Sequence, residues 1–258
     1  MRLFHIFVLV FFLPSACGAA EPVAGNFRVE TELTVQQTGE KVKTTTLFAG
    51  ELVYDMIGEH GETTIFDKAT DTFTLLEPTL RIQTKVNASE LKETVLKFRA
   101  IMREKSLQPF YAFAVSPKFK EAYEEESGLA RFQSSWMDYQ IETMPLADDA
   151  LGGRYYDFCD WYCFLNLRVN PDSKTMFARM EVNRFLRERK RFPKQIHLDI
   201  YTKGNSGIAG IVTAPDAYIS THKLGTRFIP SDEQRLQRID EQRKTFRTVS
   251  FEEYLKER

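Results

Sequence analysis

The sequence predicts an α+β fold: a curved, mainly antiparallel β-sheet, or half-barrel, with helices covering its concave face and a further helix at the C-terminus. Between residues 27 and 86, apolar and polar side chains alternate in short segments, as they do in strands with one wet face. From residue 91, apolar side chains instead recur every three or four residues, which is typical of an amphipathic helix. Because sheet and helix each have one apolar face, we expect them to pack together in layers.

The segment 27–35 is the clearest predicted strand. Its apolar side chains share one parity and its charged side chains share the other. The segment 80–86 alternates in the same way, so the two patterns bracket a sheet that is predicted to be apolar on one face only. The apolar side chains of these two segments include Phe27, Val29, Leu33, Leu80 and Ile82.

Tight turns divide this region into a six-stranded meander. Gly39, Gly50 and Gly61 stand in or beside three of the turns, and Pro78 marks another. The predicted strands are 27–35, 42–48, 52–56, 63–66, 72–76 and 80–86.

A helix is predicted over 91–102. Leu91, Phe98 and Met102 lie on one side of it, and Asn87 or Ser89 is available as its N-cap. We expect this helix to cover the apolar face of the meander, because that face directly precedes it and has no other cover.

The rest of the chain repeats both patterns. Further strands are predicted at 110–115, 118–123, 129–143, 195–201 and 208–213, and helices at 151–169, 175–189 and 232–247. The C-terminal helix has few apolar side chains, so we place it on the outside. Ser231 and Gln234 have capping-box spacing at its start, and Ser250 and Glu253 repeat this spacing before a last short helix.

The first 20 residues resemble a secretory signal peptide. Arg2 precedes an apolar run from Leu3 to Leu13, and small residues follow up to an expected cleavage site near Ala20. We expect residues 21–258 to form one domain that is exported, either periplasmic or secreted, and that contains no transmembrane span. Lipidation at Cys17 remains an alternative.

Composition excludes several classes of function. Lys and Arg number 35 against 36 Asp and Glu, so the overall charge does not favour nucleic acid as a partner. The glycines at 204–210 lack the spacing of a dinucleotide-binding loop, and a nucleophile elbow is missing, so we predict no cofactor and no catalytic residue. The basic run Arg187–Arg191 is interpreted as a solvated helix end, with contact to nucleic acid or anionic lipid as the alternative.

Two pairs on the helix 151–169 have spacings that bring side chains together. Cys159 and Cys163 lie four residues apart, which would suit a soft metal, but packing of two small residues is the favoured interpretation. Asp157 and Asp160 are three apart and are interpreted as solvated carboxylates or as partners of Arg154 and Arg168, rather than as an acid and base pair. The three histidines after residue 20 are dispersed and form no metal-binding motif: His60, His197 and His222.

The phrase IFDKATDTFTLLEPTLRIQTKV resembles the strand–turn–strand segments of bacterial lipoprotein-carrier-like proteins. The resemblance covers 27–86, and more loosely 110–143, whereas the segment YYDFCDWYCFLNLRVN is closer to uncharacterised secreted bacterial proteins. It implies a half-barrel whose concavity shelters a lipid-like ligand.

The sequence therefore favours a non-enzymatic protein that binds a lipid-like or otherwise apolar ligand. Two alternatives are a cell-envelope interaction module whose core is filled by its own helices and which binds an envelope protein, and an enzyme of unrecognised type. The side chains expected to line the ligand cavity are Phe27, Val29, Leu33, Leu80, Ile82, Phe98, Met102 and Trp136.

Overall fold

The computed structural model describes residues 25–105, 107–146, 148–171, 175–201 and 215–258. The predicted signal peptide, its cleavage site near Ala20 and the predicted strand 208–213 lie outside these residues. None of the described helices is long and apolar enough to cross a membrane.

A single sheet of 12 strands forms the body of the molecule, in the order β12-β6-β5-β4-β3-β2-β1-β11-β10-β9-β8-β7. Every neighbouring pair is antiparallel except β12 and β6. The strands are β1 (Phe27–Val35), β2 (Lys41–Ala49), β3 (Leu52–Ile57), β4 (Thr63–Asp67), β5 (Thr72–Glu77), β6 (Ile82–Asn87), β7 (Lys120–Glu124), β8 (Leu129–Gln133), β9 (Met137–Pro145), β10 (Arg191–Ile200), β11 (Asp216–Gly225) and β12 (Arg247–Thr248).

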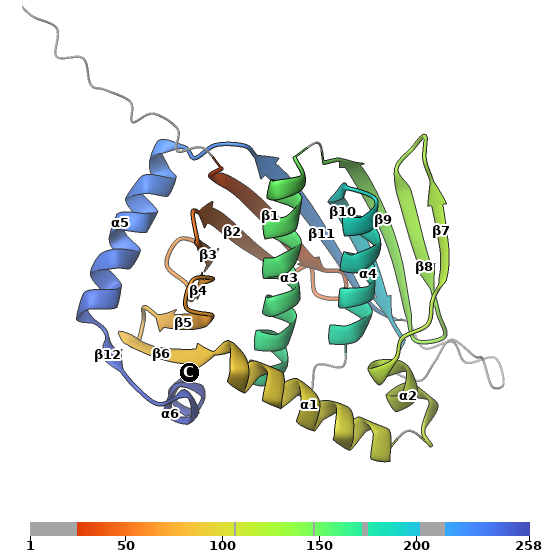
Figure 1. The fold of residues 1–258 in the computed structure, drawn as a ribbon, viewed down its shortest axis with the longest axis horizontal. Helices are drawn as coiled ribbons and strands as arrows, with labels where there is room; N and C mark the ends of the chain where they lie inside the picture. Colours follow the sequence, from red (N-terminus) through yellow and green to blue (C-terminus); the bar gives the residue numbers. More distant parts are fainter. Residues whose placement is uncertain (1–24, 106, 147, 172–174, 202–214) are drawn as a thin grey trace, which may run out of the picture.

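Helices lie on both sides of this sheet. In Figure 1, α3 and α4 run side by side in front of its centre, α1 crosses beneath them, and α5 stands beyond the meander. The helices are α1 (Ala88–Glu104), α2 (Pro109–Val115), α3 (Asp149–Val169), α4 (Met176–Glu188), α5 (Pro230–Thr245) and α6 (Phe251–Glu257). The predicted α+β fold with an open, mainly antiparallel sheet is confirmed.

The inner core lies between the meander and α3. Phe27 and Phe48 stack with ring centroids 4.0 Å apart, and Phe158 of α3 meets Phe48 edge to face at 5.8 Å. Phe66 and Phe73 form a second stacked pair at 4.5 Å, and Phe48 and Phe73 are fully buried. Because α3 contributes its own aromatic side chains here, this half of the concave face is closed.

The outer face of the meander is also covered, so the prediction of a one-sided sheet is wrong for β2 to β5. Ile239 of α5 is 3% exposed and packs on outward-facing side chains of the four strands. These side chains are Leu47, Tyr54, Met56, Ile65 and Leu76. The C-terminal helix is therefore outside the sheet, as predicted, but it forms a second apolar layer with it.

The start of α5 is fixed by a buried ion pair. Asp232 accepts a hydrogen bond from the Ile229 N–H at 3.0 Å, and its carboxylate contacts Arg28 at 3.1 Å and Arg235 at 3.2 Å. The predicted capping box at Ser231 and Gln234 is therefore wrong, because the helix begins earlier and uses Asp232 at the third helical position. At α6 the predicted cap is found, since Ser250 Oγ accepts from the Glu253 N–H.

Helix α1 begins as predicted but is seated differently. Asn87 is its N-cap, and the Glu90 carboxylate accepts the Asn87 N–H at 3.2 Å. Only Leu91 belongs to the inner core, whereas Phe98 and Met102 join a separate cluster with residues of α3 and α4. The helix thus packs across the ends of α3 and α4 instead of covering the meander, whose face α3 occupies.

Three predicted strands differ from the structure in type or in bounds. The predicted strand 110–115 is helix α2, which Pro109 starts at its first turn. The predicted strand 129–143 is interrupted by a turn, because the Ser134 hydroxyl accepts from the N–H groups of Trp136 and Met137. Strand β6 begins at Ile82, since Arg81 has φ of +54° and ends a turn that leaves Leu80 44% exposed.

This placement of β6 predicts that substitutions at two neighbouring apolar residues have different effects on the stability of the protein. Ile82→Val should lower the free energy of unfolding by about 1 kcal/mol, because it removes a methylene from a side chain that is 1% exposed. Leu80→Ala should change it by less than about 0.5 kcal/mol. Urea denaturation of both variants measures the change in the free energy of unfolding. A larger decrease for Leu80→Ala than for Ile82→Val would contradict the start of β6 at Ile82.

Candidate functional site

A row of polar side chains crosses the concave face of the sheet between its two apolar halves. Val29, Phe48 and Val53 point into the inner core, so residues of the same parity in the same strands also point inward. The strand register places these residues beside one another, Asp55 opposite Thr46 and Thr31 opposite both Thr44 and His222. We call this set the concave polar row: Asp55, Thr46, Thr44, Thr31, His222 and Ser220.

Asp55 is the acidic member of the row. Its side chain accepts a hydrogen bond from Thr46 Oγ1 at 2.6 Å, and Asp55 is 8% exposed. Burial raises the pKa of the Asp55 carboxyl to about 6, although hydrogen bonds from Thr46 and from Tyr162 of α3 oppose the rise. No ion pair joins Asp55 to a cation in the described part of the chain.

His222 is the centre of a neutral hydroxyl cluster on β1 and β11. Its Nδ1 lies 3.0 Å from Thr31 Oγ1, and its Nε2 lies 3.0 Å from Ser220 Oγ. Burial, together with the positive charge of Arg179, lowers the pKa of His222 to about 3. The imidazole is therefore uncharged at neutral pH, with one ring nitrogen donating and the other accepting.

Helix α3 covers the row with weakly polar side chains. Burial raises the pKa of the Cys159 thiol to about 11 and that of Cys163 to about 12, so both thiols stay protonated at neutral pH. Both cysteines are free, and the described residues contain no cluster of His, Cys, Asp or Glu that could hold a metal ion. The favoured interpretation as packing residues is supported, because Cys159 packs against the inner core and Cys163 against the cluster of α1, each with part of its surface exposed.

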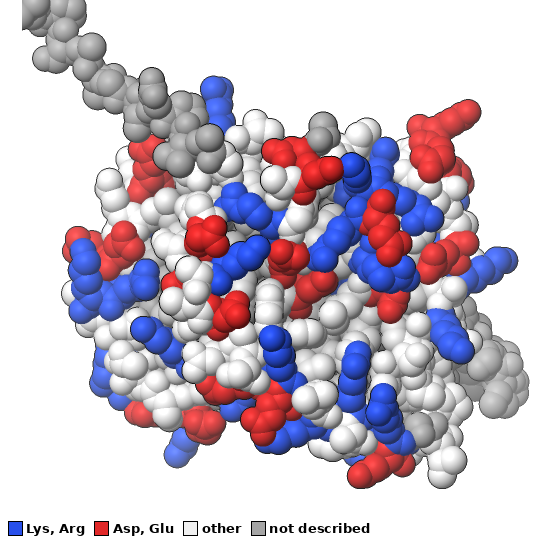
Figure 2. Space-filling model, viewed as in Figure 1, with Lys and Arg blue, Asp and Glu red and all other residues white. Residues whose placement is uncertain are grey.

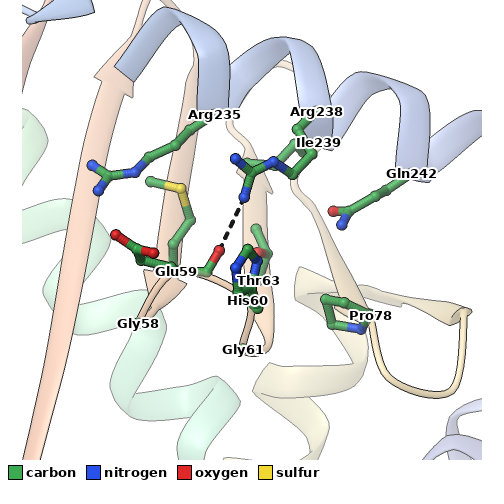
Figure 3. Close-up of a pocket in the computed structure, with 11 residues that line it drawn as sticks. Gly58, Glu59, His60, Gly61, Thr63, Pro78, Arg235, Arg238, Ile239 and Gln242 are labelled. Atoms are coloured by element: carbon green, nitrogen blue, oxygen red, sulfur yellow. Dashed lines mark hydrogen bonds between the residues drawn. The ribbon is translucent and has the colours of Figure 1, made fainter. Parts of the chain in front are cut away.

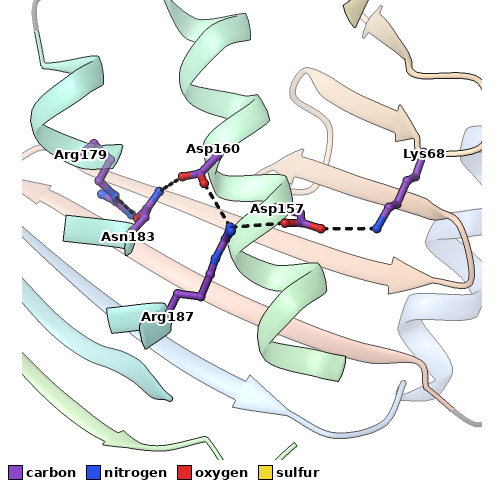
Figure 4. A network of polar contacts seen from close by, with 6 residues as sticks. All are labelled: Lys68, Asp157, Asp160, Arg179, Asn183 and Arg187. Carbon is purple, nitrogen blue, oxygen red and sulfur yellow. Dashed lines mark hydrogen bonds and ion pairs between the residues drawn. The ribbon is translucent and has the colours of Figure 1, made fainter. Parts of the chain in front are cut away.

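Ion pairs bind α3 to α4 and to the turn after β4 (Figure 4). Asp160 contacts Arg187 at 3.1 Å and accepts from Asn183 Nδ2 at 2.8 Å. Asp157 lies between Arg187 and Lys68, 3.4 Å from each. The partners predicted for these two carboxylates were Arg154 and Arg168, but Arg154 instead binds the Gly50 carbonyl and Arg168 pairs with Glu252.

The basic run at the end of α4 is also engaged. Lys190 pairs with Asp149 at 2.7 Å, and Arg191 Nε donates to Thr143 Oγ1 at 3.0 Å. Arg189 lies over the Phe185 ring at 3.6 Å. Arg187, Arg189 and Lys190 are exposed, as predicted for a solvated helix end, whereas Arg191 is partly buried at the start of β10. On the face shown in Figure 2, basic and acidic side chains are interspersed and do not gather into a patch of one sign.

The concave face is not closed equally along its length. Near the start of β1 the inward side chains are buried under α3, whereas toward its end they keep partial exposure. Inward side chains of β11 and of the last part of β10 also keep partial exposure, and α4 faces this region in Figure 1. The inward-facing, partly exposed residues include Thr31, Leu33, Thr44, Leu198, Ile200, Ser220 and His222.

The eight predicted cavity residues are distributed over different parts of the fold. Phe27, Val29 and Ile82 lie in the inner core with Trp136 at its border, and Phe98 and Met102 are in the cluster of α1. Leu80 is exposed in a turn. Two of the eight stand beside the concave polar row: Leu33 is opposite Ser220 of β11, and Val29 is opposite Thr46 of β2.

A second concavity lies on the outer face, between α5 and the turn from β3 to β4. Figure 3 shows Arg235, Arg238 and Gln242 of α5 above this turn, which carries His60. Arg238 donates to the Glu59 carbonyl at 3.1 Å, and Arg235 pairs with Asp232. Both cations therefore have protein partners, so we favour the concave polar row as the functional site.

Sequence patterns missed most of this site. His222 lies in a segment for which the sequence predicts no strand, and Arg179 lies on a predicted helix, where a charged residue is usually solvated. A signal for Arg179 exists, because Arg179, Asn183 and Arg187 recur at intervals of four and define one polar side of α4.

Comparison with known proteins adds no assignment: no protein-family model matches the chain, and no curated protein matches it.

Proposed function

We propose that this protein is an exported, non-enzymatic binding protein that holds a lipid-like, apolar ligand against the concave face of its sheet. The observation that carries the proposal is the partial exposure of inward-facing side chains where β1, β10 and β11 pass under α3 and α4. In the closed half of the same face, Phe48 and Phe73 have no exposed surface. Inward-facing side chains that keep exposed surface offer groups that a ligand can contact.

The chemistry of this region suits an apolar chain. Leu33, Leu198 and Ile200 offer aliphatic surface beside the polar row, and burial of apolar area contributes roughly 25 cal/mol per Å². The resemblance of the meander to lipoprotein-carrier-like half-barrels supports the same ligand class. The signal-peptide pattern of residues 1–20 supports export.

Filling this space should abolish binding. Leu33→Trp places a large ring among the partly exposed residues, and we expect it to weaken binding of a fluorescent fatty acid at least about tenfold, since a ligand and an indole cannot occupy the same volume. Leu80→Trp is the matched control, because Leu80 is exposed in a turn. Fluorescence titration of residues 21–258 measures both variants against the unchanged protein.

The result also separates this proposal from its alternative. The packing of α3 onto Phe48 and Phe66 favours a filled core, and such a protein would act through its surface on an envelope partner. Absence of fatty-acid binding by the unchanged protein, or equal binding by the Leu33→Trp and Leu80→Trp variants, would reject the ligand proposal and favour that alternative.

A further inference from the structure

An open hollow lies on the surface where helices α1 and α2 meet. In Figure 1, α2 follows the C-terminal end of α1, and it packs against both α1 and α4. The hollow has a volume of about 430 Å³ and shares no residue with the concave polar row. We call it the α1–α2 hollow, and its lining residues are Arg99, Arg103, Ala112, Val115 and Ser116. It therefore combines a pair of guanidinium groups with a hydroxyl and an apolar wall.

The Arg99 side chain is restrained by an aromatic ring. Its Cζ lies 4.4 Å from the centroid of the Phe177 ring, which belongs to α4. Phe177 is 6% exposed and packs in the cluster of α1, with the Phe98 ring at 6.4 Å. The contact between cation and ring holds the side chain without pairing its charge with a carboxylate. The guanidinium can therefore still bind an anion.

Neither arginine of the hollow has an acidic partner. In the described part of the chain, no ion pair joins Arg99 or Arg103 to a carboxylate, and none of the acidic side chains of α1 lines the hollow. Lys97 on the same helix shows the contrast, because it pairs with Glu93 at 2.7 Å. Helix α1 thus supplies an acidic partner to one of its cations but leaves the two cations of the hollow without one.

The spacing of the two arginines suits a doubly charged anion. Arg99 and Arg103 are four residues apart, so they lie on the same side of α1, where two like charges repel each other. An anion between them would replace this repulsion by attraction. Guanidinium groups donate parallel hydrogen bonds to phosphate oxygens, and the Ser116 hydroxyl adds a further donor. A phosphomonoester carries a charge of about −1.5 to −2 near pH 7, which balances two cations.

We propose that the α1–α2 hollow binds a phosphomonoester group, with Arg99 and Arg103 donating to its oxygens. This site is separate from the concave face and does not depend on the lipid-like ligand proposed there. Both a soluble phosphomonoester and phosphatidate, an anionic lipid, carry such a group. Leu96 distinguishes these sources, because it is 65% exposed and lies on the same side of α1, three residues before Arg99. A lipid would cover Leu96, whereas a soluble phosphomonoester would leave it exposed.

The first test uses glycerol 3-phosphate as a soluble probe. It is titrated with residues 21–258 at neutral pH and constant ionic strength, and the line width of its phosphorus NMR signal reports binding. We expect Arg99→Gln and Arg103→Gln each to weaken binding at least about tenfold, since each removes a charge-assisted pair of hydrogen bonds. Arg99→Lys should keep part of the affinity, because it keeps the charge but not the planar donors.

A control on the same helix separates the site from the overall charge. Lys97→Gln removes one positive charge from α1, as the arginine variants do, but Lys97 pairs with Glu93 and does not line the hollow. It should leave the binding of glycerol 3-phosphate unchanged. Circular dichroism checks that all variants are folded, which we expect because Arg99, Arg103 and Lys97 are exposed.

The second test identifies the source of the phosphate group. Phosphatidylcholine vesicles with and without phosphatidate are sedimented with the protein. If the group belongs to a lipid, the protein should sediment only with phosphatidate, and Leu96→Ser should weaken this binding several-fold without changing the titration with glycerol 3-phosphate. If the group belongs to a soluble molecule, the protein should bind glycerol 3-phosphate and stay in the supernatant with both kinds of vesicle.

Two results would overturn the proposal. One is that the unchanged protein binds neither glycerol 3-phosphate nor vesicles with phosphatidate. The other is that a folded variant with both Arg99→Gln and Arg103→Gln binds either of them as tightly as the unchanged protein does. Both results leave the proposed function standing, because Leu33 and the concave polar row do not line the α1–α2 hollow.

Discussion

Asp232→Ala is expected to lower the free energy of unfolding by about 3–5 kcal/mol. The Asp232 side chain is fully buried and contacts Arg28, whose side chain is 10% exposed, as well as Arg235. Removing one partner of a buried ion pair leaves the other charge poorly compensated, which costs far more than the net value of the pair. Arg28 would keep only the half-exposed Glu30, at 2.7 Å. The variant also loses the acceptor for the Ile229 N–H at the start of α5. Because α5 is the outer cover of the meander, its loosening should expose Ile239 and the apolar side chains beneath it.

A second variant on the same helix isolates the effect of burial. Asp240 faces Arg243 at 4.0 Å with more than half of its side chain exposed, so Asp240→Ala should change stability by less than about 0.5 kcal/mol. Urea denaturation at neutral pH, followed by two spectroscopic probes to check that unfolding is a single transition, gives the free energy of unfolding of both variants. Similar losses in the two variants would show that the Arg28–Asp232 pair does not hold α5 on the sheet.

The parts of the fold that the sequence predicted are those in which one side of an element is apolar and the other polar. The predicted helix 151–169 corresponds to α3, and the helix 175–189 corresponds to α4, because each buries one aromatic or aliphatic stripe. The meander was predicted for the same reason. Its two-sided burial also had a signal, since Tyr54 and Met56 on one parity and Val53 on the other are all apolar, a pattern typical of strands covered on both faces.

The central strand β11 escaped prediction for a reason connected with the site. Its inward-facing residues include Ser220 and His222, which belong to the concave polar row, so the usual contrast between an apolar and a polar face is lost. A strand that presents polar groups to the interior cannot be distinguished from a loop by its periodicity. The same exchange of apolar for polar residues that creates the candidate site therefore hides the strand that carries it.

Asp55 has a measurable consequence for the pH dependence of stability. Burial raises its pKa from the usual range to about 6 in the folded protein, so between about pH 4 and pH 6 the unfolded chain releases this proton while the folded chain keeps it. The folded state then binds more protons than the unfolded state, and the contribution of Asp55 to stability falls as the pH rises through this window. At pH 7 the loss amounts to about 3 kcal/mol relative to pH 3, as an upper bound for this one group.

Asp55→Asn should remove this loss. The amide oxygen can still accept from Thr46 and Tyr162, but the side chain carries no charge, so the variant should be more stable than the unchanged protein at pH 7 and similar to it at pH 3.5. Asp216→Asn, at an exposed position of β11, is the control and should leave the difference between the two pH values unaltered. Urea denaturation at both pH values tests this prediction. If Asp55→Asn destabilised the protein equally at each pH, the hydrogen bonds of the carboxylate would outweigh its desolvation. The expected gain would identify Asp55 as a group that weakens the fold at neutral pH, which is the behaviour of a residue whose position serves a binding site instead of the core.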